Sequence, residues 1–230
     1  MAEDGGIQAL VQVATPVCTL FGKSWRLHLR DVLRTTEEEN RAMIADTVSF
    51  LKRVGREVVY DAEHFFDGYK DSADHALATL RAAAEGGADF LVLCDTNGGA
   101  LPHEVFGITE VVKASLGIPI GIHAHNDGGC GTANSLEAVR AGAVQVQGTM
   151  NGYGERCGNA DLCDIIPNLM LKLNCDCLAD GNLAQLKDVS ELAHELANYR
   201  PDSKAPFVGD SAFAHKGGMH VDAVSYTHLT

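Results

Sequence analysis

Two histidines, His123 and His125, lie one residue apart at the end of the apolar run 118–122. On a strand, side chains two positions apart point to the same face, so the two rings share a face, and Asp127 joins them if the strand continues that far. Two neutral imidazoles side by side are typical ligands of one divalent metal ion. A single strand histidine is more often a core residue, but this pair at a strand end favours a metal site.

The glycine-rich segment 151–159, which reads NGYGERCGN, adds the amide oxygen of Asn159 as a further candidate ligand. Its glycines permit a tight backbone, which is equally typical of an ordinary turn before a helix. Two imidazoles with oxygen ligands suit Mg²⁺, Mn²⁺ or Zn²⁺ and leave positions open for a substrate. Cys157 is the one cysteine of this segment, so a thiolate site is not favoured.

The composition is that of an acidic globular chain, with 230 residues, 46% of them hydrophobic, and a formal net charge of -13. Such a charge gives no general attraction for nucleic acid or for an anionic membrane surface, and we expect neither partner. The first residues lack the basic flank and apolar stretch of a signal peptide, and no apolar run approaches the roughly 20 residues of a membrane span. Seven cysteines without paired spacing predict reduced thiols and a cytoplasmic location.

Strand-like and helix-like segments alternate along the chain. Predicted strands cover residues 10–22, 56–65, 89–99, 118–127 and 144–154. Predicted helices cover residues 35–55, 72–87, 101–117, 132–142, 161–173 and 182–198, and we expect Pro167 to break or bend the fifth. Five βα units imply parallel strands between helices, either in an open doubly wound sheet or in part of an eight-stranded barrel. No G-x-G-x-x-G follows a strand, which disfavours a dinucleotide-binding sheet.

The predicted strands are apolar until their carboxyl ends, where they become polar. The polar ends are residues 23–25, 61–64, 95–97, 123–127 and 151–159. In parallel α/β folds, this edge of the sheet is where binding and catalytic sites are built. One polar strand end usually does no more than cap the next helix, but five in succession predict a site at this edge.

Three further segments are GIHAHNDGG (121–129), GTMNGYGERCGNADL (148–162) and FAHKGGMHVDAV (213–224). In this order they resemble the metal-dependent acyl-CoA condensing enzymes, a family of 2-isopropylmalate, homocitrate and citramalate synthases related to hydroxymethylglutaryl-CoA lyase. Within the group, TLFGKSW (19–25) and VVYDAEHFFDGYK (58–70) are most similar to the citramalate synthases. The 2-isopropylmalate synthases usually carry a Ser-Pro-Glu segment in place of residues 61–63.

The resemblance implies an α/β fold, a partial TIM (β/α)8 barrel with its last five βα units in residues 1–174 and the start of a helical segment in 175–230. It implies that His123 and His125, with Asn159 as a direct or water-mediated ligand, bind Mg²⁺, Mn²⁺ or Zn²⁺ at the barrel mouth. It further implies that Glu63 lies near the acetyl group, that Thr96 contacts the carboxylate of the 2-oxoacid, and that the catalytic histidine is His220. Without the resemblance, His220 would be interpreted as a solvated loop residue.

The implied reaction is a Claisen condensation of acetyl-CoA, as co-substrate, with pyruvate to give (R)-citramalate and CoA, in isoleucine and branched-chain amino-acid biosynthesis. The implied assembly is a homodimer. The resemblance places three barrel strands, one of them with an aspartate ligand, before residue 8, so we expect residues 1–230 alone to be inactive, with open strand edges. Three alternatives remain: a 2-isopropylmalate or homocitrate synthase, a lyase of the same fold, for which Cys157 is a weak argument, and a non-catalytic fragment.

Overall fold

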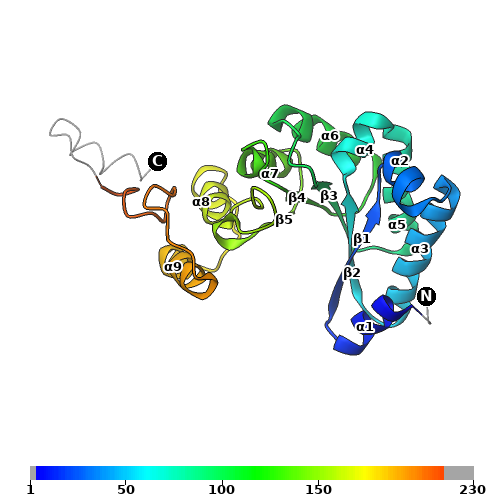
Figure 1. The fold of residues 1–230 in the computed structure, drawn as a ribbon, viewed down its shortest axis with the longest axis horizontal. Coiled ribbons are helices and arrows are strands. Elements are labelled where there is room, and N and C mark those ends of the chain that lie inside the picture. Colours follow the sequence, from blue (N-terminus) through cyan, green and yellow to red (C-terminus); the bar gives the residue numbers. More distant parts are fainter. Residues whose placement is uncertain (1–3, 215–230) are drawn as a thin grey trace. The chain divides into compact units, whose positions relative to one another are not determined.

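The chain divides into two compact units, Met1–Gln147 and Gly148–Thr230, and the computed structural model describes residues 4–214 of them. The first unit alternates strands with helices (Figure 1). Its strands are β1 (Val17–Lys23), β2 (Glu57–Glu63), β3 (Phe90–Asp95), β4 (Ile120–Ala124) and β5 (Gln145–Gln147). Its helices are α1 (Gly5–Val13), α2 (Arg26–His28), the π-helix η1 (Leu29–Leu33), α3 (Glu37–Arg53), α4 (Phe65–Asp71), α5 (Ala73–Gly86), α6 (Pro102–Ser115) and α7 (Gly131–Arg140).

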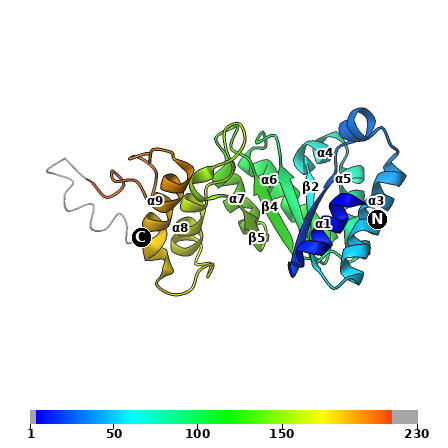
Figure 2. The same cartoon turned by 60° about the horizontal axis from the view of Figure 1, so that its bottom comes forward.

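The five strands form one parallel sheet in chain order, β1-β2-β3-β4-β5. Figure 2 shows several of them from a second direction. A doubly wound sheet reverses its strand order at a switch point, whereas a (β/α)8 barrel keeps its strands in sequence. The observed order therefore fits the predicted partial barrel. Among the described residues, β1 and β5 each pair with a single strand.

One hydrogen bond shows that the sheet curves. Gln147 of β5 donates from Nε2 to Oδ1 of Asp61 on β2 at 2.9 Å, although β3 and β4 lie between their strands. With neighbouring strands about 4.8 Å apart, a flat sheet would hold these two positions roughly 14 Å apart. The sheet must therefore curve around the face that carries both side chains, as the wall of a barrel does.

The core of the first unit includes residues of β2, α3 and α5. Val58 and Tyr60 of β2, Val48 and Leu51 of α3, and Leu80 of α5 are all fully buried. Each such aliphatic side chain contributes about 1.5–3 kcal/mol to stability. This packing leaves the carboxyl ends of the strands to carry the polar residues.

The two predicted strands at the ends of the sheet are longer than the observed ones. The strand predicted at 10–22 begins at Val17, because residues 5–13 form α1, which Asp4 caps by accepting the backbone N–H of Ile7 at 2.9 Å. The strand predicted at 144–154 ends at Gln147. Beyond it, Asn151 adopts a left-handed backbone with φ of 61°, which no strand accommodates.

Three short helices that follow β1 and β2, namely α2, η1 and α4, were not predicted from the sequence. The helix predicted at 161–173 is α8 (Leu162–Lys172), and it continues through Pro167 instead of ending there. Pro167 removes only the bond that its own N–H would donate to the carbonyl of Cys163. In the described part of the chain, none of the helices combines the length and hydropathy that a membrane span requires.

The second unit, described up to residue 214, is helical. It contains the 3-10 helices η2 (Met150–Gly152) and η3 (Asn182–Gln185), with α8 and α9 (Leu186–Ala197). Its core includes Cys163, Leu186 and Val208. The helix predicted at 182–198 corresponds to η3 and α9 together. The domain boundary predicted after residue 174 stays a prediction.

Candidate active site

The carboxyl ends of the parallel strands bring four of the six predicted site residues to one edge of the first unit. Glu63 is the last residue of β2, Thr96 follows β3, His123 lies in β4 and His125 follows it. Asn159 belongs to the second unit. The predicted catalytic histidine, His220, lies outside the described residues.

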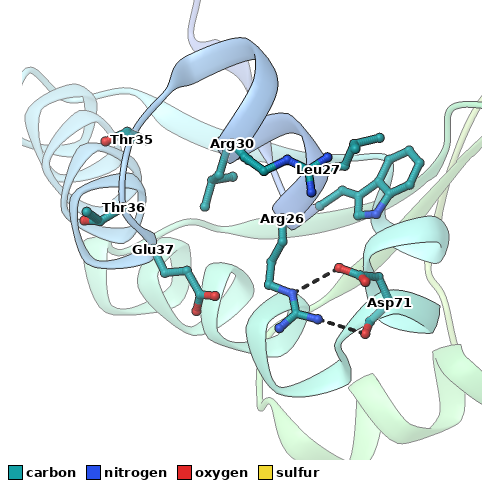
Figure 3. A pocket seen from close by; sticks show the side chains of 9 residues that line it. Arg26, Leu27, Arg30, Thr35, Thr36, Glu37 and Asp71 are labelled. Carbon is teal, nitrogen blue, oxygen red and sulfur yellow. Dashed lines mark hydrogen bonds and ion pairs between the residues drawn. The ribbon is translucent and has the colours of Figure 1, made fainter.

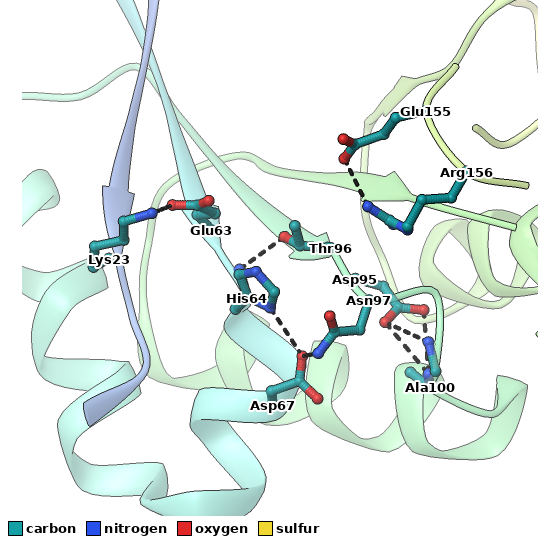
Figure 4. A network of polar contacts seen from close by, with 11 residues as sticks. Lys23, Glu63, His64, Asp67, Asp95, Thr96, Asn97, Ala100, Glu155 and Arg156 are labelled. Carbon is teal, nitrogen blue, oxygen red and sulfur yellow. Dashed lines mark hydrogen bonds and ion pairs between the residues drawn. The ribbon is translucent and has the colours of Figure 1, made fainter. Parts of the chain in front are cut away.

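Glu63 forms an ion pair with Lys23, its register partner at the end of β1 (Figure 4). Both side chains are mostly buried, with 24% and 18% exposed for Glu63 and Lys23. A partly buried ion pair in a matched strand register holds its two groups in a narrow range of positions. The pair therefore fixes the Glu63 carboxylate at the strand edge.

His64 connects the ends of β2 and β3. Its backbone N–H donates to Oγ1 of Thr96 at 2.8 Å (Figure 4). Its ring Nδ1 lies 3.3 Å from Asp67 Oδ2, and the same Asp67 oxygen accepts a bond from Asn97 Nδ2 at 2.9 Å. His64 has a left-handed backbone with φ of 55°, a strained conformation for this residue type that tends to occur at functional sites. These contacts set the position of the Thr96 hydroxyl.

Three rings pack together beside this connection. The His28 ring meets the His64 ring edge-on, with centroids 4.5 Å apart, and Trp25 lies 5.3 Å from His28 and 5.7 Å from His64. Burial lowers the pKa of His28, and the nearby His64 and Lys23 lower it further. His28 is therefore neutral at physiological pH and packs against the site as an apolar aromatic group.

The two histidines of the predicted metal site lie side by side, as their spacing requires. The ring centroids of His123 and His125 are 5.2 Å apart, with 37° between the planes. His123 Nδ1 lies 2.8 Å from Oε1 of Gln147, its register partner on β5. The backbone N–H of His125 donates to the carbonyl of Asp95 at 3.2 Å. The backbone and Gln147 thus orient the pair.

A buried carboxylate supports the loop that carries Thr96. Asp95 is 1% exposed and accepts bonds from the backbone N–H group of Ala100 at 3.2–3.3 Å (Figure 4). It also accepts bonds from the backbone N–H group of Gly99 and from Asn134 Nδ2, each at 3.2 Å. Burial raises the pKa of Asp95, and the backbone bonds to Ala100 and Gly99 oppose that shift. The carboxylate ties the end of β3 to the start of α6 and to α7.

Asn159 lies in the glycine-rich segment of the second unit. Its Nδ2 donates to the carbonyl of Tyr153 at 3.0 Å, while its Oδ1 is buried with no hydrogen-bond partner among the described residues. Gly154 and Gly158 allow this packing, since a Cβ would lie 2.5 Å from Asn159 Nδ2 at the first and 2.2 Å from the Gly152 carbonyl at the second. An orphaned buried amide oxygen is a natural ligand for a cation or its bound water.

The residues fit a divalent metal ion. The bond to Gln147 occupies Nδ1 of His123, which leaves Nε2 for a metal, and Asn159 offers an unsatisfied oxygen in its own unit. Within residues 4–214, no group of three or more His, Cys, Asp and Glu side chains is placed to hold an ion by itself. A metal held by the two histidines of the first unit would thus need water or substrate oxygens to complete its coordination.

A cavity of about 580 Å³ opens beside Trp25 (Figure 3). Arg26 and Arg30 line it, but each is already paired, Arg26 with Asp71 at 3.0 Å and Arg30 with Asp31 at 2.6 Å. The paired arginines carry little net charge into the cavity. It is therefore a weaker candidate for an anion site than the strand edge.

Comparisons with known proteins identify the family and agree with the fold. The family model described as HMGL-like matches residues 2–193. The (R)-citramalate synthase of Synechocystis sp. is 54% identical over 99% of this chain and 43% of its own length, and a probable 2-isopropylmalate synthase of Methanopyrus kandleri is 34% identical over 96% and 43%. The chain thus spans less than half the length of these relatives.

Among solved structures, the HMG-CoA lyase of Bacillus subtilis superposes with a TM-score of 0.73 at 20% identity, over 86% of this chain and 69% of that one. At that identity the likeness shows the fold alone. The predicted fold class, an α/β partial TIM (β/α)8 barrel, is confirmed.

Lys23, Asp61 and His64 belong to the predicted polar strand ends, but the sequence indicated no individual role for them or for Gln147. A signal was available for the last of them. Gln145 and Gln147 alternate with Val146 in a short strand, so the two amides lie on the same face of the sheet, beside the side chains that the neighbouring strand places on that face. That the face carries His123 follows only from the register of β4 and β5.

Proposed function

The chain belongs to the HMGL-like family, and on this premise we propose that the full-length protein joins acetyl-CoA and pyruvate to give (R)-citramalate and CoA. The observation that carries the proposal is the 54% identity to an (R)-citramalate synthase over 99% of the chain. The strand-edge site supports it, because paired imidazoles, a carboxylate and a hydroxyl occupy the edge where barrel enzymes act.

We propose that His123 and His125 hold the metal, with Asn159 as a direct or water-mediated ligand. Mg²⁺ or Mn²⁺ suits the oxygen ligands best, and Zn²⁺ is the alternative. When bound, the ion supplies a Lewis acid for the keto group of the oxoacid. The side-by-side rings and the orphaned Asn159 oxygen are the structural support for this set.

The other residues position the organic substrates. The His64 backbone N–H positions the Thr96 hydroxyl at the strand edge, where we expect Thr96 to contact the carboxylate of the oxoacid. Glu63, fixed by Lys23, lies near the acetyl group and orients the methyl that must lose a proton. His220 serves as the proton-transferring histidine. A homodimer in the cytoplasm completes the proposal.

The competing functions differ in substrate and direction. A 2-isopropylmalate or homocitrate synthase would use the same edge with a larger oxoacid, and the 34% identity to such a relative is well below 54%. A lyase would cleave instead of condense, but its support is a structural likeness at 20% identity. The condensing function with pyruvate is therefore favoured.

The metal assignment is tested on the full-length protein with His123→Ala and His125→Ala. Each variant should lose most affinity for Mn²⁺, measured by titration calorimetry, and nearly all turnover of acetyl-CoA and pyruvate. Products are identified by mass spectrometry, since the exposed cysteines Cys157 and Cys177 would react with a thiol reagent for CoA. Metal-dependent activity in either single variant would refute the ligand assignment.

The substrate is tested by comparing kcat/KM for pyruvate, 2-oxoisovalerate and 2-oxoglutarate. We expect pyruvate to be preferred and (R)-citramalate to be released. A preference for either larger acid would exclude the proposed substrate and leave the condensing class intact. Cleavage of an acyl-CoA with no condensation would exclude both.

A further inference from the structure

A three-residue chain of side chains runs across the inner face of the sheet, from Asp61 on β2 through Gln147 on β5 to His123 on β4. Gln147 Nε2 lies 2.9 Å from Asp61 Oδ1, and Gln147 Oε1 lies 2.8 Å from His123 Nδ1. Asp61 and Gln147 are half-buried, and Val59 and Val92 of the same face are buried core residues. Polar groups in such surroundings are held to specific partners.

The donors and acceptors of this chain have one consistent assignment. A carboxylate has no hydrogen to donate, so the Gln147 amide must turn its NH₂ toward Asp61. Its carbonyl oxygen then faces His123, and a carbonyl oxygen only accepts. His123 Nδ1 must therefore carry the ring hydrogen. A neutral imidazole has one such hydrogen, so the lone pair is on Nε2.

We propose that Asp61 and Gln147 are positioning residues that hold His123 as the Nδ1–H tautomer, with the Nε2 lone pair presented to the metal. This inference rests on the proposed metal site. Metal-bound histidines commonly donate their second N–H to an oxygen, which fixes both tautomer and ring orientation. Here the oxygen belongs to an amide, and a neutral amide can rotate by half a turn. Asp61 supplies the constraint that the amide lacks.

The structure offers a sharp test, because the two groups can be exchanged. In Asp61→Asn, residue 61 can donate as well as accept, so Gln147 can turn its NH₂ toward His123. Nδ1 would then have to accept, which places the hydrogen on Nε2 and blocks the metal. In the double variant Asp61→Asn with Gln147→Glu, the amide at 61 donates to the carboxylate at 147, which accepts from His123. The charge and size of the pair are then those of the original.

Two measurements on full-length protein report on the proposal. The first is the ¹⁵N–¹H ring spectrum of histidine-labelled, metal-free protein at a pH where imidazoles are neutral, with His123→Ala used to assign the signal. The second is Mn²⁺ affinity by calorimetry, with the metal alone. We expect the Nδ1–H pattern in the original protein. We expect a mixed or Nε2–H pattern and roughly 10–100-fold weaker Mn²⁺ binding in Asp61→Asn. The double variant should recover both.

The outcomes separate this inference from the proposed function. An Nε2–H pattern at His123 in the original protein refutes the inference without any variant, whether or not the protein binds metal. An Nδ1–H pattern at His123 together with unchanged Mn²⁺ affinity in Asp61→Asn also refutes it. So does a double variant that keeps the altered His123 pattern and the weak Mn²⁺ binding of Asp61→Asn while the ring signals of its other histidines are unchanged. If His123→Ala binds Mn²⁺ normally, the ligand assignment of the proposed function is wrong, and the presentation of Nε2 to a metal falls with it.

Discussion

The clearest structural prediction concerns Asp95, the buried carboxylate that anchors the loop carrying Thr96. Asp95→Ala removes the acceptor for three donors, the backbone N–H groups of Gly99 and Ala100 and the side-chain amide of Asn134. At about 1 kcal/mol for each net bond, the loop loses ~3 kcal/mol. The loss of a buried charge offsets part of this, because burial raises the pKa of Asp95 and the ionised form is costly.

The assay is amide hydrogen exchange in the full-length protein, because it reports on single backbone groups. Since 1.4 kcal/mol corresponds to a factor of ten, ~3 kcal/mol reduced by this offset predicts exchange that is faster by up to about 100-fold at Gly99 and Ala100. Asp95→Asn keeps one acceptor oxygen but turns an NH₂ toward a donor. Its exchange at Gly99 and Ala100 should be about tenfold faster than in the original protein, between the original and Asp95→Ala. Glu110→Ala is the control, since Glu110 is an exposed carboxylate of α6.

The same loop positions Thr96, so the predicted change has a kinetic counterpart. If Thr96 binds the oxoacid as proposed, Asp95→Ala should raise KM for pyruvate more than it lowers kcat, because the ligands of the metal are unaffected. Exchange at Gly99 and Ala100 within threefold of the original protein would show that Asp95 does not hold the loop. The reasoning from its three bonds would then be refuted.

Three further predictions follow from other parts of the chain. Gly86→Ala should lower the melting temperature, equivalent to about 1–2 kcal/mol, because its Cβ would lie 2.8 Å from the Ala45 carbonyl. The matched Gly107→Ala, in an open part of α6, should raise the melting temperature, equivalent to a gain of up to ~1 kcal/mol in stability. If both variants shifted the melting temperature in the same direction, the packing argument would be contradicted. Burial raises the pKa of Asp164 to about 6, so its ionisation costs stability as pH rises from about 4 to 6. Asp164→Asn should therefore stabilise the protein above pH 6, by ~1 kcal/mol once solvent exposure and the helix dipole are allowed for. Thermal melts at several pH values test this, and a difference in melting temperature between variant and original protein that does not change with pH would contradict it. Finally, removal of the divalent ion with EDTA should abolish pyruvate binding, measured by saturation-transfer NMR, and undiminished binding would contradict the proposed site.

The sequence was sufficient for the alternation of strands and helices and for the edge that carries the candidate site. Both depend on short-range periodicity, which left a doubly wound sheet and a partial barrel open, and the family resemblance favoured the barrel. The shared face of His123 and His125 is equally local, because alternation along one strand decides it. Asn159 was predicted as a candidate ligand from its glycine-rich segment and from the family resemblance, and its role stays a prediction. The structure explains the glycines, because the backbone is so tight that a Cβ at Gly158 would overlap a carbonyl.

What the sequence could not supply depends on side chains that meet from distant strands. The bond between Asp61 and Gln147 joins residues 86 positions apart and forms only because the sheet curves. The ion pair of Lys23 and Glu63 requires the exact register of β1 on β2. Local rules also misplaced the start of β1, where a cap at Asp4 turns an apolar stretch into helix. Contacts of this kind follow from tertiary geometry, and no local pattern encodes them.

We expect the proposed metal to contribute to substrate binding as well as to chemistry. The substrates proposed here are anions, and residues 1–230 carry a net charge of -13, so the field of these residues opposes the approach of such substrates. The cations near the end of β1 do not compensate, because Lys23 is paired with Glu63, Arg26 with Asp71 and Arg30 with Asp31. With these three cations paired, the proposed divalent ion would supply the positive charge that an anionic substrate needs at the strand edge. In the proposed function, the His123–His125 pair would then determine where the oxoacid binds, and the tautomer of His123 would matter before any bond is made.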